Sequence, residues 1–133
     1  SSFEDELMHI ETYISLEKLR FDDRINVIYD LQTTDFNVPV LSIQPIVENA
    51  IKHGILKKVE GGTLKISTYE AEDSYVIVIE DNGVGFNNDD VKKEENHYGI
   101  NNIEYRIKNM CNGSLDIKSV INKGTIVTIT LKK

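Results

Sequence analysis

Three polar residues near the middle of the chain, Asn49, Lys52 and His53, could act together on a metal–phosphate complex. They lie three and four positions apart, so on a helix they would share one face. An amide oxygen can bind Mg²⁺, while an ammonium group and an imidazole can lie beside phosphate oxygens. Taken alone, the cluster is more typical of an ordinary solvated polar face at the end of a helix.

A second cluster, Asp-Asn-Gly-Val-Gly-Phe at residues 81–86, follows an apolar stretch that is typical of a buried strand. Gly83 and Gly85 would let the backbone pass close to a flat ligand. The Asp81 carboxylate could accept a hydrogen bond from an amino group such as N6 of adenine. The alternative is an Asn-Gly hairpin turn, but residues 87–96 show no alternation that would form its second strand.

Glycines also precede two later elements. Gly99 stands before an apolar helical pattern, and the start of a helix offers free amides and a positive dipole end to phosphates. Gly124 and Thr125 stand at the start of the last predicted strand. An ordinary capped helix and an ordinary strand-entry turn are the alternatives. The neighbours of Gly99 in this cluster are Tyr98, Ile100 and Asn101.

Hydrophobic periodicity predicts the elements that must position these clusters. The predicted helices cover residues 3–17, 39–54 and 100–110, and the predicted strands cover residues 25–31, 64–68, 75–79, 115–117 and 125–131. Pro39 is expected to open the second helix, although Pro45 also suits a first turn. The order α-β-α-β-β-α-β-β predicts one α+β domain: a two-layer α/β sandwich with a mixed five-stranded sheet and three helices on one face.

The composition restricts the partners. The chain has 133 residues, of which 40% are hydrophobic, which is enough for one domain with a real core. A net charge of −7 argues against nucleic acid or an anionic membrane as the main partner. No apolar run approaches the about 20 residues that a membrane-spanning helix needs. The single Cys111 excludes an internal disulfide and a Cys-based zinc site, and it is expected to be a buried thiol.

Taken in order, the clusters resemble the nucleotide-binding boxes of the ATPase fold shared by histidine kinases, type II topoisomerases, Hsp90 chaperones and MutL. Residues 44–54 (Gln-Pro-Ile-Val-Glu-Asn-Ala-Ile-Lys-His-Gly) resemble the N box. Residues 81–85 resemble the G1 box, residues 98–102 the G2 box and residues 123–125 the last glycine box. Four such segments in the right order form a specific pattern.

The finer similarity is to LytS-like, or YehU-like, sensor histidine kinases, whose N box has the form Gln-Pro-x-Val-Glu-Asn-Ala-x-Lys-His-Gly. Residues 13–24 are similar to the segment that precedes the N box in these kinases. The resemblance implies a Bergerat-type ATP-binding catalytic domain over residues 25–133. It also implies that residues 1–24 are the end of the helix of an upstream dimerisation and kinase region.

The resemblance also implies a role for each residue singled out above. Asn49 would coordinate Mg²⁺ on the ATP phosphates, with Lys52 and His53 near those phosphates as the catalytic group. Asp81 would accept a hydrogen bond from the adenine amino group. The other implied ATP contacts are Gly83 and Gly85 at the adenine, Tyr98, Gly99, Ile100 and Asn101 at the phosphates, and Gly124 and Thr125 at the adenine end.

In these kinases the γ-phosphoryl group passes to a histidine that is followed by Phe, and none of His9, His53 or His97 is followed by Phe. We therefore expect the acceptor to lie outside this chain, in an upstream domain. The resemblance further implies a mobile ATP lid over residues 87–97, a homodimeric parent and a response regulator as partner. It places this domain in the cytoplasm, with the parent at the cell membrane.

Three other functions stay open. An ATP hydrolase of the same fold resembles this chain, but such enzymes carry a water-activating Glu four residues before the N-box Asn, where this chain has Pro45. Glu48 should point about 100° away from Asn49 on a helix. An anti-sigma-factor serine kinase has the same pocket, but residues 13–24 argue against it. The third alternative is a nucleotide-binding module without catalysis.

Overall fold

The structure, a computed structural model, describes residues 1–87 and 98–133. Its helices are α1 (Phe3–Phe21), α2 (Gln44–Asn49) and α3 (Tyr98–Cys111). Its strands are β1 (Ile25–Leu31), β2 (Gly62–Glu70), β3 (Ser74–Asp81), β4 (Ser114–Val120) and β5 (Gly124–Lys132). A π-helical turn (Ala50–Gly54) continues α2, and 3-10 turns occupy Asp22–Arg24 and Ile55–Lys57. This is the predicted order of helices and strands.

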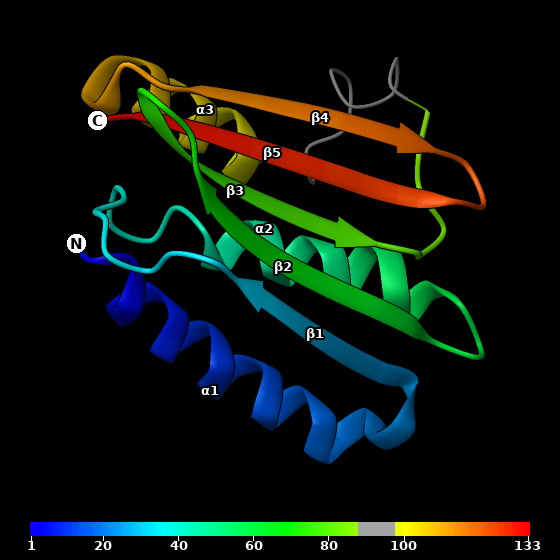
Figure 1. The fold of residues 1–133 in the computed structure, drawn as a ribbon. Coiled ribbons are helices and arrows are strands. Elements are labelled where there is room, and N and C mark those ends of the chain that lie inside the picture. Colours follow the sequence, from blue (N-terminus) through cyan, green and yellow to red (C-terminus); the bar gives the residue numbers. More distant parts are fainter. Residues whose placement is uncertain (88–97) are drawn as a thin grey trace.

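The strands form one mixed sheet with the order β1-β2-β3-β5-β4 (Figure 1). β1 runs parallel to β2, and every other neighbouring pair is antiparallel. The parallel pair requires a crossover connection, and α2 lies in it. In β3 and β5 the register sets Asp81 opposite Thr125, so two of the singled-out residues become direct neighbours.

One hydrophobic core lies between the sheet and the helices. All three helices contribute to it, which confirms the predicted two-layer sandwich with its helices on one face (Figure 1). Its buried members include Phe3, Ile10 and Ile14 of α1, Ile46 and Val47 of α2, Ile103 and Ile107 of α3, and Leu64, Ile66, Ile77, Ile79, Val127 and Ile129 of the sheet. Successive residues on β2, β3 and β5 point alternately to this core and to the opposite face, so residues two apart share a face.

The second helix begins at Gln44, so the prediction that Pro39 opens it was wrong. The Val38 amide donates to the carbonyl oxygen of the first residue at 2.8 Å, which ties this segment to the N-terminus in an extended conformation. Leu41 then has a φ of 54°, outside the right-handed helical region, and interrupts any helix running from Pro39. Pro45 lies in the first turn of α2, where its missing amide hydrogen is not needed.

A buried carboxylate joins α1 to the segment that leads into α2. Glu6 is 2% exposed, and its Oε1 accepts the Ser42 amide hydrogen at 3.1 Å. At the other end of this helix pair, the Tyr13 side chain lies near the carboxylates of Glu17 and Glu48, and burial together with these charges raises the pKa of Tyr13. α1 is therefore tied to the segment before α2 by a buried hydrogen bond as well as by apolar contacts.

Two predictions fall on parts that the structure does not describe. Apart from Asn87, the predicted lid over residues 87–97 lies outside the described residues. The backbone of Cys111 ends α3, but its side chain also lies outside them, so its predicted burial stays a prediction.

Candidate nucleotide-binding site

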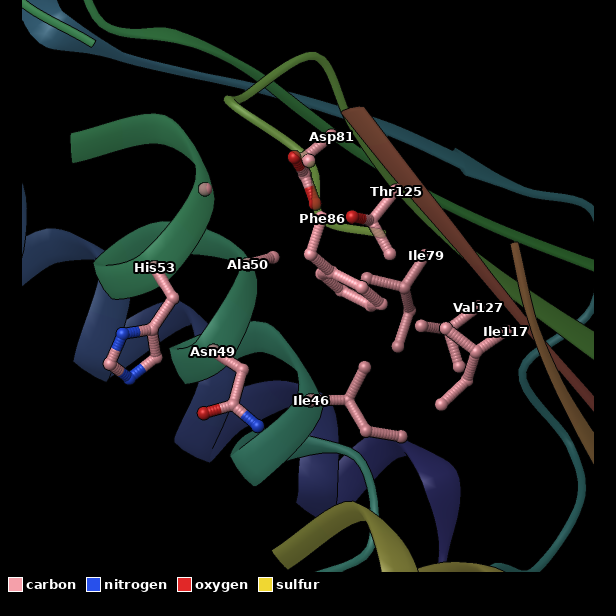
Figure 2. A pocket seen from close by; sticks show the side chains of 12 residues that line it. Ile46, Asn49, Ala50, His53, Ile79, Asp81, Phe86, Ile117, Thr125 and Val127 are labelled. Carbon is pink, nitrogen blue, oxygen red and sulfur yellow. The ribbon is translucent and has the colours of Figure 1, made fainter. Parts of the chain in front are cut away.

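A hollow lies between α2 with its π-helical continuation and strands β3, β4 and β5 (Figure 2). Most of its wall is apolar, and its polar side chains come from two places. Asp81 and Thr125 project from the sheet, whereas Asn49 and His53 project from the helical side. The remaining lining residues are Ile46, Ala50, Gly54, Ile79, Gly85, Phe86, Ile117 and Val127. An apolar slot with a few fixed polar groups is typical of small-molecule sites.

The Asp81 carboxylate is the most perturbed acid at this site. It is 9% exposed at the end of β3, and its Oδ1 accepts the Gly83 amide hydrogen at 2.8 Å. Burial raises the pKa of Asp81 to about 6, while the Gly83 amide, the Lys58 ammonium and the Thr125 amide act in the opposite direction. The carboxylate is therefore a partly desolvated acceptor, which an incoming hydrogen-bond donor would stabilise.

Close backbone packing holds this carboxylate in place. A Cβ atom at residue 83 would lie 2.2 Å from the carbonyl carbon of Gly54, so only glycine allows the loop to touch the end of the helix. The Val84 amide donates to the Gly54 carbonyl at 3.2 Å across the same contact. A Cβ atom at Gly124 would lie 2.0 Å from the Asp81 carbonyl oxygen. Gly83 and Gly124 thus support Asp81 from behind and do not line the hollow.

Gly85 turns the chain back over the hollow. Its φ is +65°, and a Cβ atom there would lie 2.1 Å from the Val120 carbonyl oxygen. The next amide, of Phe86, donates to Ser119 Oγ at 2.8 Å, and the Phe86 ring lies among the lining side chains (Figure 2). The cavity volume is about 40 Å³, room for roughly three water molecules.

Of the three polar residues predicted to share a helix face, only two lie at the hollow. Asn49 and His53 line it, whereas Lys52 is exposed and is not among the lining residues. The segment after Asn49 is π-helical, because the Ile55 amide bonds to the carbonyl of Ala50 five residues earlier. The sequence predicted a regular α-helix through residue 54, and π-helical turns are frequent at functional sites.

Two further expectations concern phosphates and metal. Tyr98, Gly99, Ile100 and Asn101 form the first turn of α3, but their side chains lie outside the described residues. Within residues 1–87 and 98–133, no cluster of three or more His, Cys, Asp or Glu side chains could hold a metal ion. The hollow therefore offers Mg²⁺ one protein oxygen, the side-chain oxygen of Asn49. This fits Mg²⁺, which often binds through one protein oxygen together with phosphate oxygens of a ligand.

The apolar lining of the hollow was not singled out from the sequence. The strand period carries the missing signal: Ile79 precedes Asp81 by two, and Val127 follows Thr125 by two, so each pair shares a face. Ser119 carried no signal in the sequence, because its role depends on contacts with residues that are distant along the chain.

Comparison with known proteins agrees with this geometry. A family model described as histidine kinase-, DNA gyrase B- and HSP90-like ATPase matches residues 39–133. The chain belongs to this ATPase family. Within it, the domain is 38% identical to the protein YwpD of Bacillus subtilis, over 98% of this chain and 50% of YwpD.

Named relatives and a solved structure place this ATPase-family domain more finely. It is 40% identical to the sensor protein LytS of Staphylococcus saprophyticus, over 63% of this chain and 15% of LytS, which confirms the predicted resemblance. It superposes on the catalytic domain of histidine kinase ThkA with a TM-score of 0.74, covering 100% of this chain and 94% of that one. At 12% identity, that similarity shows the fold alone. The chain thus spans half of YwpD and a small part of LytS.

In the described part of this ATPase-family domain, no helix is both long enough and apolar enough to cross a bilayer.

Proposed function

We propose that this domain binds Mg-ATP and donates the γ-phosphoryl group to a histidine in an upstream dimerisation domain of a two-component sensor kinase. The observation that carries the proposal is the buried Asp81 carboxylate at the end of an apolar slot whose helical side bears Asn49 and His53. The slot suits a flat base, the carboxylate suits an exocyclic amino group, and the helical side suits phosphates.

In this proposal the chain supplies binding and orientation. The Asp81 carboxylate accepts from the backbone amides of Gly83 and Thr125, and its remaining lone pairs would accept from adenine N6. The apolar lining excludes water around the base, which strengthens that hydrogen bond. Asn49 would hold Mg²⁺ against the phosphates, and the bound metal would neutralise part of their charge. Tyr98, Gly99, Ile100 and Asn101 would offer backbone amides at the start of α3.

The transfer itself needs little acid–base chemistry from this domain. An imidazole nitrogen of the acceptor forms a bond to the γ-phosphorus, and the bond to the β–γ bridging oxygen breaks, releasing ADP. Positioning and charge stabilisation dominate such reactions. Asn49, Lys52 and His53 would act as the catalytic group at the phosphates, with the exposed Lys52 approaching them from outside the hollow.

Two features favour a phosphotransferase over a hydrolase. Pro45, in the first turn of α2, stands where a water-activating carboxylate would be needed and cannot perform acid–base work. Glu48 is not among the lining residues, and its charge acts instead on Tyr13 of α1. A bound water that cannot be activated will not compete with the acceptor histidine.

The remaining parts of the proposal concern the parent protein. We propose that residues 1–24 are the end of the upstream dimerisation and kinase region, in line with the way α1 packs through Phe3, Ile10 and Ile14 on the catalytic core. A homodimeric parent at the cell membrane, with this domain in the cytoplasm and a response regulator as partner, follows from the same family. Nucleic acid is not proposed as a partner, given the net charge of −7.

Replacing Asn49 by Ala tests the metal's role. Calorimetry should show that Mg²⁺ strengthens ATP binding to the unmodified protein, and that Asn49→Ala loses this gain, a weakening of roughly 10- to 150-fold. An amide does not titrate, so the loss should not depend on pH between 6 and 9, in keeping with a metal ligand and not a base. The matched control is Asn26→Ala, an exposed amide on β1 far from the hollow. Mg²⁺-dependent binding that survives in Asn49→Ala would overturn the assignment.

A further inference from the structure

Ser119 of β4 lies at a junction of three segments that surround the base end of the hollow. Its side chain is 4% exposed, and its Oγ contacts Phe86 in the loop after β3 and two residues at the start of β5, Gly124 and Thr125. The Phe86 amide donates to it at 2.8 Å, it donates to the Gly124 carbonyl oxygen at 3.1 Å, and Thr125 Oγ1 lies 2.8 Å away.

The chemistry of these partners favours one direction for the Ser119–Thr125 contact, because only one direction satisfies all three contacts together. A hydroxyl has one hydrogen, and a carbonyl oxygen can only accept, so the hydrogen of Ser119 goes to Gly124. The Phe86 amide can only donate, and it fills one lone pair of Ser119 Oγ. All three contacts are hydrogen bonds at the same time only if Thr125 donates its hydroxyl hydrogen to Ser119, which is the arrangement adopted here. Thr125 Oγ1 then presents only lone pairs to the hollow that it lines.

Asp81 is the neighbour of Thr125 across the β3–β5 pair, and both side chains lie at the same end of the hollow (Figure 2). An ionised carboxylate also only accepts hydrogen bonds. Building on the ATP site proposed above, we propose that Ser119 is a positioning residue that makes this end of the hollow an acceptor-only surface, and so favours a 6-amino purine over a 6-oxo purine. An amino group supplies two hydrogens to the two acceptors, whereas an oxo group would set lone pairs against lone pairs.

The test compares Mg-ADP with Mg-IDP, whose base carries an oxo group in place of the amino group at position 6. Binding constants for both are measured on the unmodified protein, on Ser119→Ala and on the control Ser114→Ala, an exposed serine of the same strand. Without Ser119, the Thr125 hydroxyl can rotate and donate to the oxo group. The preference for ADP should fall by about 5- to 10-fold in Ser119→Ala and stay unchanged in Ser114→Ala.

The ratio separates positioning from simple loss of structure, because a destabilised pocket would weaken both ligands alike. An unchanged ratio in folded Ser119→Ala overturns this inference alone, whereas failure of the unmodified protein to bind ADP overturns the proposed function and this inference with it. Should Ser119→Ala not fold, NMR of the unmodified protein decides. A Thr125 hydroxyl proton protected from exchange and close to the Ser119 β protons is expected, and a rapidly exchanging one contradicts the inference.

Discussion

Asp81→Asn should make the protein more stable while removing its hold on adenine. Burial raises the pKa of Asp81 from 3.8 to about 6, so the folded state binds this proton more tightly than the unfolded state. The ionised group is therefore a cost to folding, which grows as the pH rises from about 4 to 6 and is complete above that. At pH 8 the neutral Asn should raise the free energy of unfolding by up to about 3 kcal/mol, measured by urea denaturation.

The effect of Asp81→Asn on binding has the opposite sign. If the amide oxygen keeps the Gly83 hydrogen bond, the amide nitrogen faces the base and offers donors to an amino group that also donates. ADP affinity should fall roughly 10- to 150-fold at pH 8. In the unmodified protein, ADP affinity should weaken as the pH falls through about 6, and Asp81→Asn should remove the part of this dependence that exceeds the titration of the ADP phosphate itself. Asp116→Asn, at an exposed carboxylate of β4, is the control, and equal ADP affinity in the two variants would refute the role of Asp81.

Gly83→Ala should be among the most damaging single-methyl changes in the described part of the domain. The new Cβ would lie 2.2 to 2.5 Å from the carbonyl carbon, Cα and carbonyl oxygen of Gly54, all backbone atoms that cannot rotate away. The loop must separate from the helix end, which moves the amide that holds Asp81. We expect a loss of about 3 kcal/mol or more in the free energy of unfolding, and no measurable ADP binding.

Gly62→Ala is the matched control for this prediction. The new Cβ would lie 2.3 Å from Oδ1 of Asn82, which is the end of a flexible side chain that can rotate away. Thermal unfolding should therefore separate the two variants clearly. A Gly83→Ala protein that unfolds at the same temperature as Gly62→Ala would mean that the Gly54 contact does not constrain the loop.

Much of the fold follows from local patterns in the sequence. The helical spacing of Phe3, Ile10 and Ile14 and the alternation along β2 and β5 depend only on which side chains must leave water, so they predicted the elements and the two layers. The start of α2 could not be predicted in the same way. Residue 39 is a proline, which suits a first turn, but the pairing of this segment with the N-terminus is a contact between distant parts of the chain.

The site, like the fold, was predictable where it depends on residue types and not where it depends on contacts between distant parts of the chain. The residue types at Asn49, His53, Asp81 and Thr125 indicated what each group could do, and the structure brings these four around one hollow. The support behind them was not predictable, because it arises from backbone contacts such as that between Gly54 and Gly83. The position of Lys52 depends on the π-helical turn, for which the sequence has no clear pattern.

The most direct test of the account is phosphoryl transfer itself. The purified chain is incubated with Mg²⁺ and γ-labelled ATP, alone and with the acceptor-bearing helical domain of its parent protein, and the label is assayed for the acid lability and base stability of phosphohistidine. We predict no stable label on the chain alone, slow ATP hydrolysis, and labelling of the supplied domain at a histidine followed by Phe. Labelling of His9, His53 or His97 in the isolated chain, or rapid hydrolysis without transfer, would contradict the account.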